Sequence, residues 1–322
     1  MTDNQQPAST SDDSDREQRL IETIMKGDAA GLAKILDAAD DQQELLTHRI
    51  GNSRPTNHVI GHGATLLQFA SYRPERSGDA VLVLLDRGAE IDIHSACGLG
   101  RTDRIEEILS TRPDAVTDQV DTYFPIQYAI TAKQPDSVDC LLNHGDDPNR
   151  DLKKMAYFGW EDELVDTDYS PWKPIHMASL YGFDASRIPV VETLVKHGAD
   201  LNCVSPLDGY RPIHLVAMPN RVDMIRFFAS QGVDVNSRTE QCKVFALSSE
   251  NESSVSGFEC TALMVTCGEG FVEAAECLIE LGADVNARNS EGKSALDFAS
   301  KRFWNGQPYD QVIKVLTDHG AK

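Results

Sequence analysis

The sequence predicts an all-α solenoid of about eight repeated helix pairs, with long loops inserted between some of them. Two short patterns recur in phase along the 322 residues. Pro-Leu-His or an apolar variant of it occurs as ATLLQFA, YFPIQYA, WKPIHMA, YRPIHLV, CTALMVT and KSALDFA. Units of about 33 residues that recur in this way are typical of stacked repeats. The other pattern, Gly-x-Asp-x-Asn or a variant, begins at Gly88, Gly145, Gly198, Gly232 and Gly282, with a truncated copy at Gly320.

Short amphipathic helices between these patterns are the third observation. In PVVETLVKH, for example, Val191, Leu194 and Val195 recur at helical spacing. A helix of about ten residues is only marginally stable alone, so its apolar stripe has to be buried against a neighbouring unit. The glycine that follows each second helix lets the chain end that helix through a positive φ angle.

In chain order, the acidic and polar residues 1–16 come first, and their lack of large apolar residues after the initial Met predicts a disordered acidic tail. The segment LIETIMKGDAAGLAKILDAA then predicts a first, degenerate unit. A further unit, HSACGLGRTDRIEEILSTRPDAVTDQ, divides the long interval between Gly88 and Gly145, with Pro113 and Asp114 in place of the glycine pattern.

With these markers in place, residues 17–322 resemble the ankyrin-repeat family. The unit of that family has a turn, a Thr-Pro-Leu-His-x-Ala segment that opens a first helix, and a second helix that ends at Gly-Ala-Asp-x-Asn. The resemblance implies a solenoid of helix pairs with finger loops between consecutive units. It names no partner, because this scaffold carries many functions.

Two histidines occupy the histidine position of the Pro-Leu-His pattern, His176 and His214. The resemblance implies that each hydrogen-bonds backbone groups of adjacent turns, and a buried recurring polar side chain must satisfy its polar atoms. Ligand contact and catalysis are the alternatives. The sequence departs from the family at two threonine positions, which are Lys173 and Arg211, and at four histidine positions, which are Gln68, Gln127, Met264 and Asp297.

Three insertions, at about residues 47–62, 151–170 and 239–257, are expected to extend the finger loops, where insertions in repeat arrays often lie on the binding face. The middle one brings Tyr157, Phe158 and Trp160 together among acidic residues. Exposed aromatic side chains beside carboxylates suit a basic, partly apolar partner. Alternatively, these rings pack against the neighbouring groove of the same molecule.

Four further residues are predicted to contribute to binding. If the family geometry holds, Trp172 and Tyr181 lie on the inner side of the stack, before and after the helix that contains His176. Asn220 and Arg221 occupy the corresponding helix-end turn one unit later.

The sequence predicts no metal, cofactor or catalytic site. His48, His58 and His62 lie close together, with His94 one unit later, but no cysteine pair accompanies them and three or four zinc ligands must converge with set geometry. We therefore expect a polar loop there. The common motifs of serine hydrolases, zinc proteases, calcium sites and nucleotide sites are absent from the sequence.

Net charge and cysteine content restrict the classes of partner and the cellular compartment that we expect. The net charge is −21, from 51 acidic and 30 basic residues, so the average surface potential repels nucleic acid and anionic lipid. The seven cysteines are scattered without a Cys-x-x-Cys pair, which favours a reducing, cytoplasmic setting. We expect a monomer that binds a protein partner, without nucleic acid or membrane.

These observations predict a protein-interaction scaffold or adaptor that binds its partner through the concave face and the extended finger loops. The alternative is an enzyme or small-ligand binder, with a pocket in the concave groove under the inserted loops. A deep pocket lined by His, Asp and aromatic residues would favour the alternative, whereas an open groove would favour the scaffold.

Overall fold

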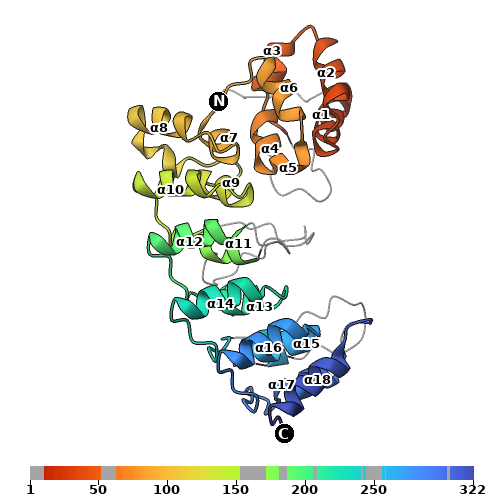
Figure 1. Cartoon of the computed structure of the whole chain (residues 1–322). Helices are drawn as coiled ribbons and strands as arrows, with labels where there is room; N and C mark the ends of the chain where they lie inside the picture. Colours follow the sequence, from red (N-terminus) through yellow and green to blue (C-terminus); the bar gives the residue numbers. More distant parts are fainter. Residues whose placement is uncertain are drawn as a thin grey trace, which may run out of the picture. The chain divides into compact units, whose positions relative to one another are not determined.

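The computed structural model describes residues 11–51, 63–152, 172–180, 187–205, 209–240, 242–243, 256–257, 259–302 and 305–322. The chain forms two compact units, the first mainly of residues up to Asp147 and the second mainly of residues from Pro148 onward (Figure 1).

The first unit contains four helix pairs, α1/α2, α4/α6, α7/α8 and α9/α10, with three short helices between them. Successive first helices pack together, as α4 does on α7 and α7 on α9. The bounds are α1 Ser11–Met25, α2 Ala29–Asp37, α3 Gln42–Thr47, α4 Leu66–Tyr72, α5 Pro74–Ser77, α6 Ala80–Asp86, α7 Ile93–Gly98, α8 Thr102–Thr111, η1 Pro113–Thr117, α9 Pro125–Thr131 and α10 Pro135–Asn143.

The second unit contains four more pairs, so the described part of the chain has the eight that the repeat count predicts. The first helices α11, α13, α15 and α17 pack in sequence, and α14, α16 and α18 pack beside them (Figure 1). The bounds are α11 Pro174–Leu180, α12 Ile188–Lys196, α13 Pro212–Ala217, α14 Val222–Ser230, α15 Ala262–Glu269, α16 Val272–Glu280, α17 Ala295–Ser300 and α18 Tyr309–Asp318.

Burial explains why these short helices are stable. Every residue of α9, α11 and α13 is buried, whereas the second helices bury one stripe only, such as Met224, Ile225 and Phe228 in α14. The glycines of the Gly-x-Asp-x-Asn pattern, with the truncated copy at Gly320, have φ between 83° and 93°, as their role in ending the second helices requires. The prediction of an all-α repeat solenoid is confirmed.

Two details differ from the sequence prediction. Helix α1 begins at Ser11, so residues 11–16, which were assigned to the disordered tail, are helical. Arg16 explains part of this order, because its guanidinium donates two hydrogen bonds, of 2.7 and 3.0 Å, to the carboxylate of Asp41. Within the third insertion, β1 Cys242–Lys243 pairs antiparallel with β2 Ser256–Gly257 and forms a small hairpin ladder.

Asparagines of the Gly-x-Asp-x-Asn pattern join consecutive repeats. The side-chain amide of Asn236 donates to the carbonyl of Gly282 at 3.1 Å and accepts from the backbone N–H of Asp284 at 2.8 Å. Asn149 and Asn286 make the equivalent pair of bonds to the next repeat. Asn202 occupies the same position, but within the described residues its side chain makes no hydrogen bond.

We expect Asn236→Ala to lower the free energy of unfolding by about 1–3 kcal/mol, because it leaves two backbone groups without their partner. Asn202→Ala removes no side-chain hydrogen bond, so its effect should stay within about 0.5 kcal/mol. Urea titrations followed by circular dichroism compare the two variants. Equal losses in both would contradict this account of the asparagines.

Candidate functional site

The two histidines of the Pro-Leu-His pattern are fully buried in the second unit. His214 Nδ1 accepts a hydrogen bond from the backbone N–H of Arg211 at 3.2 Å, so the ring proton is on Nε2. That proton points to the carbonyls of Ser237 at 3.1 Å and Cys260 at 3.2 Å. His176 repeats the arrangement with the N–H of Lys173 and the carbonyl of Cys203.

These contacts require a neutral imidazole. Burial lowers the pKa of His214 to about 4, although the carbonyls of Cys260 and Ser237 act in the opposite direction. Burial also lowers the pKa of His176 to about 4. Both side chains therefore hold loops in place, as the resemblance to the ankyrin-repeat family implied, and neither is a base exposed to a substrate.

Other residue types occupy the histidine position in four repeats and keep the contact with the backbone N–H three positions earlier. Gln68 Oε1 accepts from the N–H of Thr65 at 2.8 Å, and Gln127 Oε1 accepts from the N–H of Phe124 at 2.9 Å. Asp297 accepts from the N–H of Ser294 at 2.7 Å. The sulfur of Met264 lies 3.5 Å from the backbone nitrogen of Thr261. In the repeat of Gln68 the hydroxyl of Thr65 also accepts from the N–H of Gln68 at 3.2 Å, which completes a capping box.

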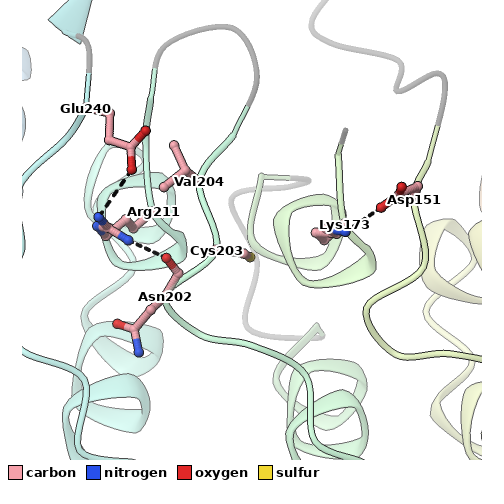
Figure 2. A pocket seen from close by; sticks show the side chains of 7 residues that line it. All are labelled: Asp151, Lys173, Asn202, Cys203, Val204, Arg211 and Glu240. Atoms are coloured by element: carbon pink, nitrogen blue, oxygen red, sulfur yellow. Dashed lines mark hydrogen bonds and ion pairs between the residues drawn. The ribbon is translucent and has the colours of Figure 1, made fainter. Parts of the chain in front are cut away.

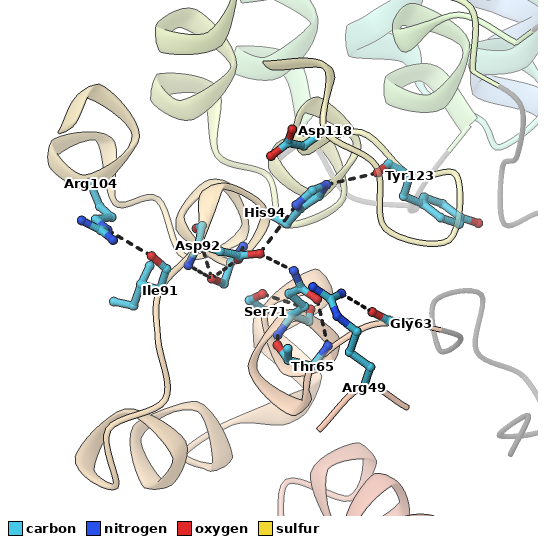
Figure 3. A network of polar contacts seen from close by, with 12 residues as sticks. Arg49, Gly63, Thr65, Ser71, Ile91, Asp92, His94, Arg104, Asp118 and Tyr123 are labelled. Carbon is cyan, nitrogen blue, oxygen red and sulfur yellow. Dashed lines mark hydrogen bonds and ion pairs between the residues drawn. The ribbon is translucent and has the colours of Figure 1, made fainter. Parts of the chain in front are cut away.

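His94 is a further loop-holding histidine, whereas the sequence predicted a polar loop for the group of histidines that includes it. It lies one position before the usual slot in α7, and its Nε2 is 3.2 Å from the carbonyl of Tyr123 (Figure 3). Burial alone would raise the pKa of Asp92, but hydrogen bonds from His94 and Ser95 outweigh burial and lower it to about 2. Because His94 lies one residue before the histidine position of the pattern, the pattern did not predict this role.

The second unit has a hollow of about 490 Å³ beside its finger loops. Its polar lining includes the two cations that replace the family's threonine, Lys173 and Arg211, each just before the first residue of α11 or α13 (Figure 2). The hollow is lined by Asp151, Lys173, Asn202, Cys203, Val204, Arg211 and Glu240. The sequence marked both cations as departures from the family but did not predict that they share one hollow.

Backbone carbonyls hold these cations toward the protein. Lys173 Nζ donates to the carbonyl of Asn149 at 3.0 Å and forms an ion pair with Asp151. Arg211 donates to the carbonyls of Asn202 and Arg238, the latter at 3.1 Å, and its Nη2 lies 3.7 Å from Glu240 Oε1 (Figure 2).

The carboxylates beside the cations face solvent. The side chains of Asp151 and Glu240 are 67% and 64% exposed, against 23% and 24% for Lys173 and Arg211. The next repeat shows a similar arrangement, because Arg238 donates to the carbonyls of Glu259 and Arg288 while its Nη1 is 3.9 Å from the exposed carboxylate of Glu259. We call Asp151, Glu240 and Glu259 the finger carboxylates.

Cys203 lies against His176, with Sγ 3.2 Å from Nε2, a distance that resembles a nucleophilic dyad. Burial raises the pKa of Cys203 to about 12, helped by the charge of Asp200. A reactive cysteine needs a lowered pKa and a cationic neighbour, whereas here both groups are held neutral. The pair is therefore a packing contact.

The predicted aromatic binding residues Tyr157, Phe158, Trp160 and Tyr181 lie outside the described residues. Trp172 is described and is only 4% exposed. Its ring packs edge-on against the imidazole of His176, with centroids 5.6 Å apart, so its surface is used for internal packing.

Asn220 and Arg221 take part in contacts within the second unit. Asn220 has a φ of 60°, and its Oδ1 accepts from the N–H of Ala274 at 3.0 Å. It thus caps α16 of the next repeat, whose own N-cap residue Phe271 provides no side-chain bond. Arg221 is 4% exposed, and its Nε lies 3.4 Å from Asp223. Their roles in partner binding stay predictions.

The histidines weighed as metal ligands separate into different environments. His48 Nε2 is 2.7 Å from Glu17, His94 is the buried loop-holding residue above, and His58 and His62 lie outside the described residues. No group of three or more potential metal ligands occurs in the described ranges.

Comparison with known families matches the region that contains these features. A family model for ankyrin repeats in many copies matches residues 175–229, and a model for three ankyrin repeats matches residues 237–322. The chain is an ankyrin-repeat protein. Repeats of this family are generally protein-protein interaction modules.

Curated ankyrin-repeat relatives match this chain over 22% to 95% of its length. The ankyrin repeat protein nuc-2 of Neurospora crassa is 25% identical over 345 residues, covering 95% of this chain but 28% of the relative. Human ankyrin repeat and SOCS box protein 6 is 30% identical over 133 residues, which is 40% of this chain and 28% of the relative. Ankyrin repeat domain-containing protein 49 of Drosophila melanogaster is 35% identical over 75 residues, which is 22% of this chain and 35% of the relative. The chain thus spans less than a third of the first two relatives.

The helices in the described ranges are all too short or too polar to cross a bilayer.

Proposed function

We propose that this ankyrin-repeat protein is an interaction scaffold or adaptor whose second unit binds a partner segment with basic side chains. The observation that carries the proposal is the arrangement around the hollow. Donors of Lys173 and Arg211 are used on backbone carbonyls, while the finger carboxylates stay exposed. The surface that faces a partner therefore carries carboxylates, which accept hydrogen bonds from basic side chains.

The net charge of −21 supports the same direction of recognition, because it attracts a basic segment and increases its association rate at low ionic strength. Exposed ion pairs contribute only about 0.2–1 kcal/mol each, so they contribute more to the specificity of binding than to its affinity. We propose that Tyr157, Phe158 and Trp160 of the middle insertion supply apolar anchors, since aromatic residues dominate binding energies.

The hollow does not support the alternative of an enzyme or small-ligand pocket. Its described lining holds no aromatic residue, and its thiol beside His176 is held neutral. Six of the seven cysteines are free, namely Cys97, Cys140, Cys203, Cys260, Cys267 and Cys277, which fits the proposed cytoplasmic setting. We further propose that the protein acts as a monomer, with one partner segment for each chain.

The test compares three forms of the full chain in affinity enrichment from an extract of the cells that make it. The finger variant is Asp151→Asn, Glu240→Gln and Glu259→Gln. The control, Glu106→Gln, Glu192→Gln and Glu276→Gln, changes the same charge at exposed sites on α8, α12 and α16. A protein retained by the wild type and the control is purified and titrated calorimetrically.

We expect the finger variant to raise the dissociation constant about tenfold at low salt, from three pairs of the size given above, and the control to change it less than twofold. The difference should shrink as salt increases, because exposed charges are screened. An aromatic variant with Tyr157, Phe158 and Trp160 all changed to Ala tests the anchors. Equal affinity of the finger variant and the control would overturn the proposal.

A further inference from the structure

The junction between α11/α12 and α13/α14 differs from the other junctions of the second unit. The backbones of α14 and α16 pack closely, as do those of α16 and α18, whereas those of α12 and α14 lie further apart. The first helices α11 and α13 still pack on each other. Contact is thus kept on one side of this junction and reduced on the other.

The asparagine link is also missing here. Asn236 and Asn286 each join their repeat to the next through two hydrogen bonds, whereas Asn202, at the same position before α13, makes none with its side chain in the described region. Two backbone groups that the other repeats use for stacking are therefore not bridged at this junction.

Side chains on the second helices show the same difference. Arg226, the fifth residue of α14, pairs with Glu280, the ninth residue of α16, at 2.6 Å. The corresponding positions across α12 and α14 are Glu192 and Ser230, which cannot form an ion pair. Asn220 caps α16 from the preceding repeat, and its counterpart at position 186 lies outside the described residues.

The finger side of the junction remains tied. Arg211, at the start of α13, donates to the carbonyl of Asn202, and His176 of α11 donates to the carbonyl of Cys203. A junction that is tied along one edge and loosely packed along the other can bend about the tied edge. In a repeat array, stability is a sum of unit and interface contributions, so a weak interface also separates cooperative parts.

We propose that this junction is a hinge that divides the second unit into two cooperative parts, residues 172–202 and 209–322. The hollow spans the hinge, with Lys173 on one side and Arg211 on the other (Figure 2). Bending therefore sets the separation of these two walls. The inference concerns the free protein and stands whether or not the hollow binds a basic segment.

Native-state hydrogen exchange of the full chain, measured by mass spectrometry, tests the hinge with two matched variants. Leu194 of α12 and Leu278 of α16 are both fully buried, so Leu194→Ala and Leu278→Ala remove the same side-chain atoms on opposite sides of the junction. In Leu278→Ala we expect exchange in α14 and α16 to rise about 100-fold and exchange in α11 and α12 to change less than threefold.

In Leu194→Ala the expected pattern is reversed, with faster exchange confined to α11 and α12. The spread of the Leu278→Ala effect from α16 into α14 is the internal control, because that junction is packed and linked. If either alanine variant fails to fold, Leu194→Val and Leu278→Val allow the same comparison with smaller increases. Comparable increases on both sides of the junction in either variant would overturn the hinge.

Discussion

Lowering the pH from 7 to 4.5 is expected to destabilise the second unit by about 2 kcal/mol for each of His176 and His214. Both imidazoles have a folded pKa of about 4, below their ordinary value of 6.5. The unfolded chain therefore binds more protons in this range. The contribution is fully present above pH 6.5 and is lost as the pH falls toward 4.

The glutamines of this chain provide a matched variant for that experiment. Gln68 and Gln127 stand at the histidine position of their repeats and accept the same backbone hydrogen bond. The double variant His176→Gln and His214→Gln should lose about 1–3 kcal/mol at pH 7, because at each site a carbonyl loses part of its bonding.

Between pH 6.5 and 4.5 the glutamine variant should lose much less stability than the wild type, because glutamine does not titrate. Most carboxylates release their stabilisation only closer to their own pKa values, so this range reports mainly on the histidines. Urea titrations at several pH values, followed by circular dichroism, measure both curves. Parallel curves for the two proteins would show that the histidines are not held neutral by the fold.

Gly98→Ala is expected to destabilise the first unit by about 3 kcal/mol, at the upper end of ordinary overpacking. Gly98 is the last residue of α7, where a β-carbon would lie 2.1 Å from the carbonyl oxygen of Ser71 in α4. No side-chain rotation relieves that overlap, since the obstacle is backbone. The helices would have to separate, although alanine in a helix is otherwise favourable.

Gly145→Ala is the control, because it lies in the same unit and has nothing within 4 Å of the added carbon. Its cost comes only from the φ of 91° and should be about 1–2 kcal/mol. Thermal or urea unfolding ranks the two variants. A Gly98→Ala protein as stable as the Gly145→Ala protein would contradict the close approach of α4 and α7.

The sequence predicted the repeat architecture because each repeat must solve the same stacking problem. Glycine at positive φ, the residue at the histidine position and the asparagine link recur for that reason. The structural role of His176 and His214 could be expected from their recurrence together with the resemblance to the ankyrin-repeat family. The role of His94 was missed, because it reaches Tyr123 from a position one residue earlier in its helix. A recurring pattern predicts the contacts that repeats share, but it does not predict an equivalent contact made from a different position, such as that of His94.

The candidate site was harder to predict, because it depends on exceptions to the repeat. Lys173 and Arg211 were visible as departures from the family pattern, but their shared hollow depends on which loops fold beside them. The same holds for Asn202. Its residue type matches the pattern, but within the described residues its side chain makes no hydrogen bond to the next repeat. A residue that fits the pattern and lacks its contact can be recognised only in the structure.

The most direct test of the central claim is a hydrogen-exchange footprint of the purified partner on the full chain. If the second unit binds through its finger surface, protection should appear in peptides that contain Asp151, residues 202–211, Glu240 and Glu259. Peptides from α12, α14 and α16 should exchange as in the free protein. Protection confined to those second helices or to the first unit, with the finger peptides unchanged, would contradict the account.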